Sequence, residues 1–335
     1  GYPLAAHVRE SIWAGEFPLW NPLNDCGHPF LAQWNTMALY PLALFYIVLP
    51  LSWALGVFCL LHQFAGGLGM YFLARSWTRN SHGACLAGVI YAFNGIMQNS
   101  LMWPNNIAGL GWLPWVILVV QLAWRKGGRM LVVAALLGGL QMLSGAPEVI
   151  LFTWAIGAMV LIVEMSRDAG QSSLLLRRFM VVVAVTALLA AVQLIPFFDL
   201  LRHTQRVATG ETLEWFIPWY GWANYFLPYF DNIGPQASGV VFQKSQTWTH
   251  SYYLGMAPLL VLLPAVIGNR SRLVWALAGG AILGLLLAMG PEAWIYTWLD
   301  SFLPLEVMRF PVKFLMVCAV LIPLLAAYGV RRLAF

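Results

Sequence analysis

Charged side chains are scarce in this chain. Asp, Glu, Lys and Arg make up only 9% of its 335 residues, whereas 61% of the residues are hydrophobic and the mean hydropathy is +0.74. A soluble globular domain carries roughly 25% charged residues. The shortage of charge excludes an ordinary soluble domain, and we interpret the chain as an integral membrane protein.

Cysteine pairs and the common catalytic motifs are also missing. The four cysteines form no CxxC pair, since Cys59, Cys85 and Cys318 fall inside apolar runs and Cys26 stands alone in the first loop. This pattern suggests neither a disulfide framework nor a zinc site. No GxSxG, P-loop, HExxH or GxGxxG sequence occurs in a setting that supports its chemistry. The net charge of +5 is scattered over short loops, which excludes a basic stripe for nucleic acid.

The given sequence does not begin with methionine, and its first residues do not show the pattern of a signal peptide. Residues 1–4 show neither the basic nor the apolar segment of such a peptide, and they resemble the middle of a loop. The last residues, 331–335, stop abruptly after an apolar run. We therefore expect the sequence to be an internal piece of a longer protein, with a first helix upstream of Gly1.

Long apolar runs are what the sequence has in abundance. A membrane-spanning helix needs about 20 apolar residues. Nine runs are candidates, at residues 53–74, 83–101, 106–124, 130–146, 148–164, 178–199, 251–267, 273–289 and 312–330. A further run, 37–51, is short and contains Pro41 and Pro50, so we expect a re-entrant or interfacial segment there. The predicted fold is all-α, a polytopic transmembrane helical bundle.

The whole chain, 1–335, is predicted to be one transmembrane domain. Its parts are the first external loop with the interfacial segment (1–52), six spans (53–199), a large external loop (200–250) and three more spans (251–335).

The placement of basic residues predicts the orientation of the spans. Short cytoplasmic loops are enriched in Lys and Arg, and interfaces in Trp and Tyr. Every second connection of this chain is basic, through Arg75, Arg79, Arg125, Lys126, Arg129, Arg167, Arg177, Arg178, Arg270, Arg272, Arg331 and Arg332. The connections between them carry little positive charge. Residues 1–38 and the loops 199–250 and 290–311 are therefore predicted to lie outside the cytoplasm.

Two of the predicted external segments are unusual. The opening stretch, Gly15–Phe30, holds three prolines and two glycines, so no helix can run through it. Loop 199–250 is far longer than the roughly 15 residues beyond which loops are usually functional or disordered. Its many Trp, Tyr and Phe residues argue against disorder and indicate a segment along the membrane surface.

Carboxylates and histidines at the predicted outer face are the catalytic candidates. Glu148 begins a helix there, and it is either functional or simply favoured by the helix dipole. In the opening loop, Glu10 and Asp25 are candidate general bases and His28 a candidate substrate ligand, with a plain turn at Asp25 as the alternative. A divalent metal site from Asp25, His28, His203 or His250 is an open alternative, but these residues have no diagnostic ligand spacing, so no cofactor is predicted.

Five basic residues at the outer face are candidates for binding a phosphate, namely Arg202, His203, Arg206, Arg309 and Lys313. The first three share one face of a helix with Asp199, and they either hold the phosphate by charge-assisted hydrogen bonds or form a solvated helix end. The last two lie four residues apart at the N-terminus of the final helix. The helix dipole disfavours cations there unless an anion or a carboxylate such as Glu306 is present.

Several short motifs occur in an order that resembles the YfhO-type bacterial membrane proteins, over nearly the whole chain. They are Pro18-Leu19-Trp20-Asn21-Pro22, Gly27-His28-Pro29, Tyr40-Pro41, Leu143-Ser144-Gly145-Ala146-Pro147-Glu148, Gln193-Leu194-Ile195-Pro196, Tyr253-Leu254-Gly255 and Arg309-Phe310-Pro311-Val312-Lys313-Phe314. That family is similar to the GT-C glycosyltransferases, polytopic enzymes that take a sugar from a polyprenyl-phosphate carrier at the outer face of the membrane.

The resemblance implies a function and a location. The expected protein is a glycosyltransferase of the bacterial cytoplasmic (inner) membrane, with a polyprenyl-phosphate-linked sugar as donor and an extracytoplasmic acceptor. Because the catalytic acid of such enzymes usually lies early in the first external loop, the main acid is expected upstream of Gly1, with Glu10 and Asp25 as substitutes. A non-enzymatic transporter or lipid flippase is the alternative, but it should carry charged or broken helices at the midplane, where this chain is nearly bare. A structural or assembly protein does not account for the long aromatic loop.

Overall fold

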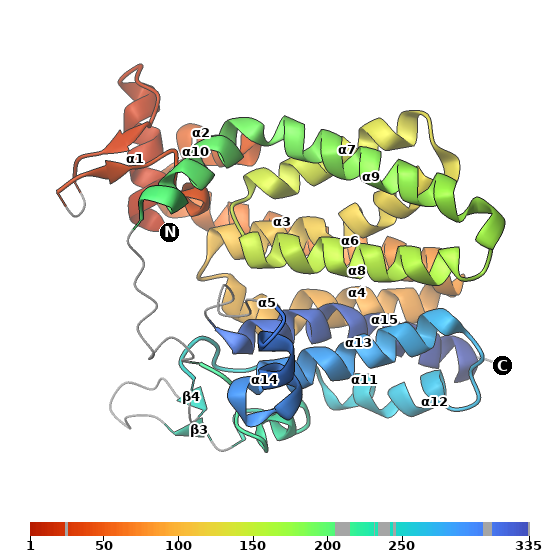
Figure 1. Cartoon of the computed structure of the whole chain (residues 1–335). Helices are drawn as coiled ribbons and strands as arrows, with labels where there is room; N and C mark the ends of the chain where they lie inside the picture. The colour runs from red at the N-terminus through yellow and green to blue at the C-terminus, as the bar shows by residue number, and fades with distance from the viewer. Residues whose placement is uncertain are drawn as a thin grey trace. The chain divides into compact units, whose positions relative to one another are not determined.

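The computed structural model describes residues 1–23, 26–204, 215–230, 246–303 and 310–333, with the backbone of 232–233 and 242–243. Helices make up most of this part of the chain (Figure 1). The only strands in it are two short antiparallel pairs, β1 (Trp20–Asn21) with β2 (His28–Pro29), and β3 (Asn232–Ile233) with β4 (Phe242–Gln243). The prediction of an all-α fold is confirmed.

Five helices of the described chain are long and apolar enough to cross a membrane, judged by length and composition. They are Leu51–Thr78, Pro104–Lys126, Pro147–Met165, Ala169–Leu189 and Pro311–Leu333. Shorter apolar helices follow the remaining predicted runs, at Ser81–Phe93, Arg129–Leu143, Met256–Val266 and Arg272–Ala288. Every predicted apolar run therefore overlaps at least one helix.

The α-helices have the following bounds. They are α1 (Tyr2–Trp13), α2 (Leu44–Val48), α3 (Leu51–Thr78), α4 (Ser81–Phe93), α5 (Gly95–Ser100), α6 (Pro104–Lys126), α7 (Arg129–Leu143), α8 (Pro147–Met165), α9 (Ser172–Leu189), α10 (Ala191–His203), α11 (Met256–Leu260), α12 (Leu262–Val266), α13 (Arg272–Ala288), α14 (Trp294–Asp300) and α15 (Leu315–Leu333).

Three of the predicted spans are not continuous helices. The run 83–101 is split between α4 and α5, because Asn94 is extended and its side chain accepts a hydrogen bond from the backbone N–H of Met97 at 2.9 Å, which starts a new helix. The run 178–199 changes from α9 to α10 at Ala190. The run 251–267 forms the two short helices α11 and α12. The segment 37–51 holds only short helical turns and α2, which are too short to cross a membrane.

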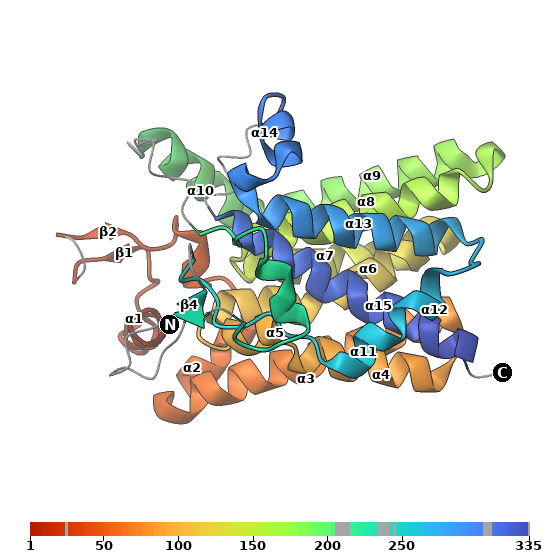
Figure 2. The same cartoon turned by 90° about the horizontal axis from the view of Figure 1, so that it is seen from below.

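The chain divides into two compact units, with boundaries inside α3, inside α5 and after α10. The first unit comprises Gly1–Gly69 and Ser100–Gln205, and the second comprises Met70–Asn99 and Arg206–Phe335. In the first unit, α6 packs against α7, α8 and α9 (Figure 1). In the second, α15 lies between α4 and α13 and also contacts α12 (Figure 2).

The first unit carries its basic turns at one end, which we call the basic end of the first unit. The end of α6 meets the end of α8 there, through Arg125 and Glu164. It also meets the first part of α9 through Arg178, which donates hydrogen bonds to the carbonyl oxygens of Trp124 and Arg125 at 3.0 and 3.1 Å. These carbonyls belong to the last turn of α6, where a cation interacts favourably with the helix dipole. Both basic connections of this unit therefore lie together, as the alternation of charge predicts.

The second unit shows the same grouping of basic residues. A Cβ atom added to Gly268 would lie 2.9 Å from the guanidinium of Arg332, so the turn before α13 meets the end of α15. A Cβ atom added to Gly83, near the start of α4, would lie 2.6 Å from the carbonyl oxygen of Ala327 in the same final helix. The starts of α4 and α13 and the end of α15 therefore share one end of this unit.

The described part of the long aromatic loop packs at the opposite end of the second unit. The backbone N–H of Ile217 donates to the carbonyl oxygen of Ala288 at the end of α13, at 3.0 Å. The backbone N–H of Val312 donates to the carbonyl oxygen of Trp215, also at 3.0 Å. Gly284, the second glycine of a GxxxG sequence in α13, lets this helix approach the final helix closely, since an added Cβ would lie 3.2 Å from Val317.

Candidate functional site

The opening loop (residues 1–38) packs on the helices of the first unit at the end opposite its basic turns. We call this end the loop end. The indole N–H of Trp34 donates to the carbonyl oxygen of Met142 at the end of α7, at 2.6 Å. The turn that follows needs glycine, because Gly145 has φ +74° and an added Cβ would collide with the carbonyl oxygen of Trp34. Asn105, at the start of α6, donates to the carbonyl oxygen of Gly145 at 3.0 Å.

Helix α10 holds the same loop from another side. The amide of Gln193 donates to the carbonyl oxygen of Leu31 at 2.8 Å, and Gln193 is itself buried. The rings of Trp34 and Phe197 lie 4.9 Å apart. The loop therefore contacts the α7–α8 turn and α10, two segments that the sequence motifs also single out.

Glu148 lies in the first turn of α8, directly after this α7–α8 turn. Its side chain is half-buried, and Pro147 provides the first helical residue before it. The N-terminal end of the helix favours a carboxylate at this position. Of the three candidate acids, Glu148 is the one that the structure places beside the anchored loop.

The other candidates in the opening loop are less enclosed. Glu10 is exposed on α1, and Asp25 lies outside the described residues. His28 is half-buried on β2, with its ring centre 6.5 Å from that of Phe30. His7 makes the closer contact with Phe30, at 4.6 Å between ring centres.

The five candidate cations are described only in part. Arg206 and Arg309 lie outside the described residues. Arg202 and His203 are exposed at the end of α10, and Nδ1 of His203 lies 2.9 Å from the carbonyl oxygen of Asp199 and 3.6 Å from its carboxylate. This pairing within one helix is the solvated helix end that the sequence left open as an alternative.

Lys313 belongs to the second unit, in the short 3-10 helix η7 (Pro311–Phe314). Its ammonium lies 5.2 Å from the ring centre of Phe310, and that ring stacks on Trp215 at 4.2 Å. Trp215 has φ +67°, an unfavourable conformation for a bulky residue. Trp215 of the aromatic loop therefore packs at the N-terminal end of the final helix. Convergence of Lys313 with Arg202, Arg206 and Arg309 stays a prediction.

A buried chain of hydrogen bonds links Tyr40, in the segment 37–51 that follows the opening loop, to α3 and α6. Sequence reasoning missed it. Nδ1–H of His62 donates to the carbonyl oxygen of Phe58 at 2.7 Å, so Nε2 is the acceptor for the hydroxyl of Tyr40 at 2.6 Å. The indole N–H of Trp112 donates to the same hydroxyl at 2.6 Å. Burial raises the pKa of the Tyr40 hydroxyl well above its usual value. The sequence feature that could have indicated this network is His62, a histidine inside the apolar run 53–74.

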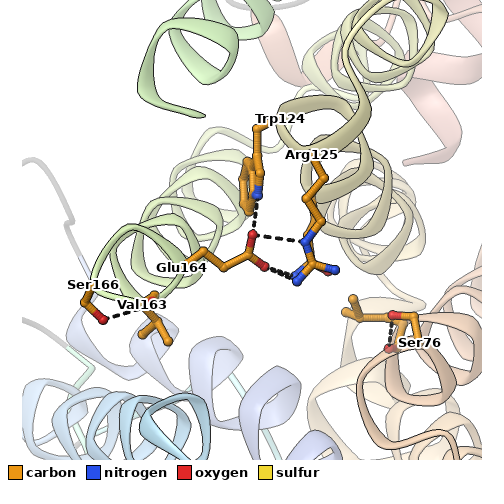
Figure 3. Close-up of polar contacts among 8 residues, drawn as sticks. Ser76, Trp124, Arg125, Val163, Glu164 and Ser166 are labelled. Atoms are coloured by element: carbon orange, nitrogen blue, oxygen red, sulfur yellow. Dashed lines mark hydrogen bonds and ion pairs between the residues drawn. The ribbon is translucent and has the colours of Figure 1, made fainter. Parts of the chain in front are cut away.

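Glu164, near the end of α8, is a second feature that the sequence did not reveal. Its carboxylate accepts hydrogen bonds from Gln121 at 2.5 Å and from the indole of Trp124 at 2.7 Å. Arg125 approaches the same carboxylate through two nitrogens, with Nε at 3.0 Å (Figure 3). The partners are about 40 residues away along the chain, so spacing gives no sign of them.

Neither a metal centre nor a known relative supplies a function for this chain. Among the described residues, no group of three or more His, Cys, Asp or Glu side chains could hold a metal ion. No protein-family model, curated protein or solved structure matches this chain.

Proposed function

We propose that this chain belongs to a membrane glycosyltransferase that moves a sugar from a polyprenyl-phosphate carrier to an extracytoplasmic acceptor. The acceptor would be a cell-envelope polymer, a lipid or a protein. The observation that carries the proposal is the placement of half-buried Glu148 beside the anchored opening loop, at the end of the first unit opposite its basic turns. A polar, ordered segment at one end of an apolar bundle suits a reaction at the membrane surface.

The proposed topology has nine spans in the bacterial cytoplasmic membrane. The basic ends of both units would face the cytoplasm, because Lys and Arg are enriched in cytoplasmic loops. The loop end of the first unit and the aromatic loop of the second would then face outward. The four shorter apolar helices would complete the nine spans together with the five long ones.

The proposed chemistry needs a base and several cations. Glu148 would deprotonate the acceptor hydroxyl, which then attacks the anomeric carbon of the donor sugar. The bond from that carbon to the lipid phosphate breaks, and the phosphate leaves with the bonding electrons. Arg202, His203, Arg206, Arg309 and Lys313 are the cations proposed to stabilise its charge, with His28 as a further ligand. Glu10, Asp25 or an acid upstream of Gly1 would replace Glu148 if it is not the base.

The alternative is a transporter or flippase. Such proteins place ionisable groups near the membrane midplane. In α6, α7 and α8 every Asp, Glu, Lys and Arg lies in the first or last turn, and the helix centres have none. The distribution of charge in these three helices favours a reaction at the surface. The interrupted spans at Asn94, Ala190 and Val261 are the features of the described chain that the alternative would also show.

The test is sugar transfer by the full-length protein in proteoliposomes, with a panel of polyprenyl-phosphate hexoses and pentoses as donors. Glu148→Gln should lower the transfer rate by roughly 10²- to 10⁴-fold, the usual contribution of a general base. Glu16→Gln is the matched control, since Glu16 is exposed in the opening stretch. Full activity of Glu148→Gln would remove Glu148 from the reaction. Lipid movement across the bilayer without transfer from any donor would favour the alternative.

A further inference from the structure

A pocket at the basic end of the first unit has no role in the proposed reaction. It has a volume of about 300 Å³ and is lined by Arg125, Glu164, Arg167, Asp168, Gln171 and Leu175. We propose that it binds the headgroup of a phosphatidylethanolamine-type lipid, a phosphate next to a primary ammonium. The volume is at the lower end of the range for small-molecule sites, which begins at about 300 Å³. The proposal is independent of sugar transfer and requires only that the unit is embedded in a bilayer.

Glu164 fixes one cation of the pocket. Its side chain is only 11% exposed, whereas that of Arg125 is 49% exposed. Arg125 uses Nε and Nη2 on this carboxylate (Figure 3), which leaves the N–H groups of Nη1 for a ligand. A guanidinium held in this way is pre-oriented for a phosphate oxygen.

The second cation and the second carboxylate follow directly along the chain. The exposed side chain of Arg167 makes no hydrogen bond or ion pair with any residue that the structure describes. Asp168 accepts from the backbone N–H of Gly170 at 3.1 Å and from the amide of Gln171 at 2.7 Å. These neutral donors hold the carboxylate in place without balancing its charge.

The balance of charge selects the class of headgroup. Two arginines and two carboxylates line the pocket, so its net charge is zero. Anionic lipids are recognised by pockets that are basic overall. A zwitterionic headgroup instead places its phosphate near Arg125 and Arg167 and its ammonium, with three donors, near Asp168. A trimethylated ammonium has no N–H group and would lose the hydrogen bond to Asp168.

Exposed apolar side chains on α9 favour a lipid over a soluble phosphorylated amine. Leu175 of the pocket lies on this helix, and the next residue, Leu176, is exposed. Met180 is exposed too, on the same face as Leu176 and four residues further along. An acyl chain would cover these side chains while the headgroup occupies the pocket.

Native mass spectrometry of the full-length protein in detergent tests the proposal with three lipids of identical acyl chains. Phosphatidylethanolamine should be retained better than phosphatidylcholine or phosphatidylglycerol. Arg167→Ala should weaken its retention roughly ten-fold, the loss expected for a charged hydrogen bond. Arg177→Ala, an exposed arginine that does not line the pocket, should have little effect. Asp168→Asn should shift the preference toward phosphatidylglycerol, because the pocket then carries a net positive charge.

Three outcomes would overturn the proposal. The unaltered protein retains phosphatidylglycerol best, or Arg167→Ala and Arg177→Ala weaken retention equally, or Asp168→Asn leaves the lipid preference unchanged. Displacement of the lipid by an equal concentration of soluble O-phosphoethanolamine would overturn the assignment to a lipid and point to a free phosphorylated amine.

Discussion

The hydroxyl of Tyr40 gives the sharpest test of how the segment after the opening loop is held to α3 and α6. Tyr40→Phe removes one oxygen atom and leaves the ring in place. The acceptor nitrogen of His62 and the indole N–H of Trp112, each 2.6 Å from that oxygen, lose their partner. His62 is only 3% exposed, so water cannot easily replace the bond. A buried group without its hydrogen bond costs about 1–3 kcal/mol, and we expect a total loss of about 2–3 kcal/mol.

The assay is thermal unfolding of the purified protein in detergent. We expect the melting temperature of Tyr40→Phe to fall by roughly 3–4 °C, because an unfolding entropy of about 2.1 cal/mol/K per residue amounts to about 0.7 kcal/mol/K for a chain of this length. Tyr2→Phe is the matched control, because Tyr2 is 57% exposed. Combining Tyr40→Phe with Trp112→Phe should cost less than the sum of the two single changes, since both remove the same bond. A melting temperature of Tyr40→Phe equal to that of the control would refute the assigned role of this hydroxyl.

Three more predictions concern sidedness and packing. In intact spheroplasts, exposed Cys26 should react with a membrane-impermeant maleimide, whereas a cysteine introduced at exposed Gln171 should react only after permeabilisation; the reverse order would invert the topology. Gly145→Ala should destabilise the protein more than Gly15→Ala, because both have φ near +75° but only Gly145 faces a close backbone; equal melting temperatures would contradict this. Glu164→Gln should cost about 1–3 kcal/mol through the loss of its charged hydrogen bonds, and an unchanged melting temperature would argue against them.

The helices were predictable because their signal is local. Each apolar run overlaps at least one helix, and the basic turns gather at one end within each unit. The breaks between helices within three of these runs could not be predicted from hydropathy. Asn94 ends one helix and starts the next through its own side chain, a choice that depends on local capping and not on hydropathy.

Only those parts of the candidate site that are adjacent in the sequence could be predicted. The sequence shows that Glu148 follows a glycine-proline turn, but it does not show the contact of the opening loop with α10, because Gln193 and Leu31 are 162 residues apart. The same holds for Glu164 and for the Tyr40–His62 contact, which depend on how distant helices pack. Single-sequence patterns do not encode such pairs.

The hydrogen bonds that hold the opening loop in place go mainly to backbone carbonyl oxygens. The side chains of Gln193, Trp34 and His7 all reach carbonyl oxygens, those of Leu31, Met142 and Trp20. A carbonyl is present whichever residue stands at the accepting position. Mutation can therefore change many accepting residues without altering the path of the chain. The path of this loop can therefore be conserved while its surface side chains vary, so related proteins can differ in the chemistry of this end and keep the same backbone.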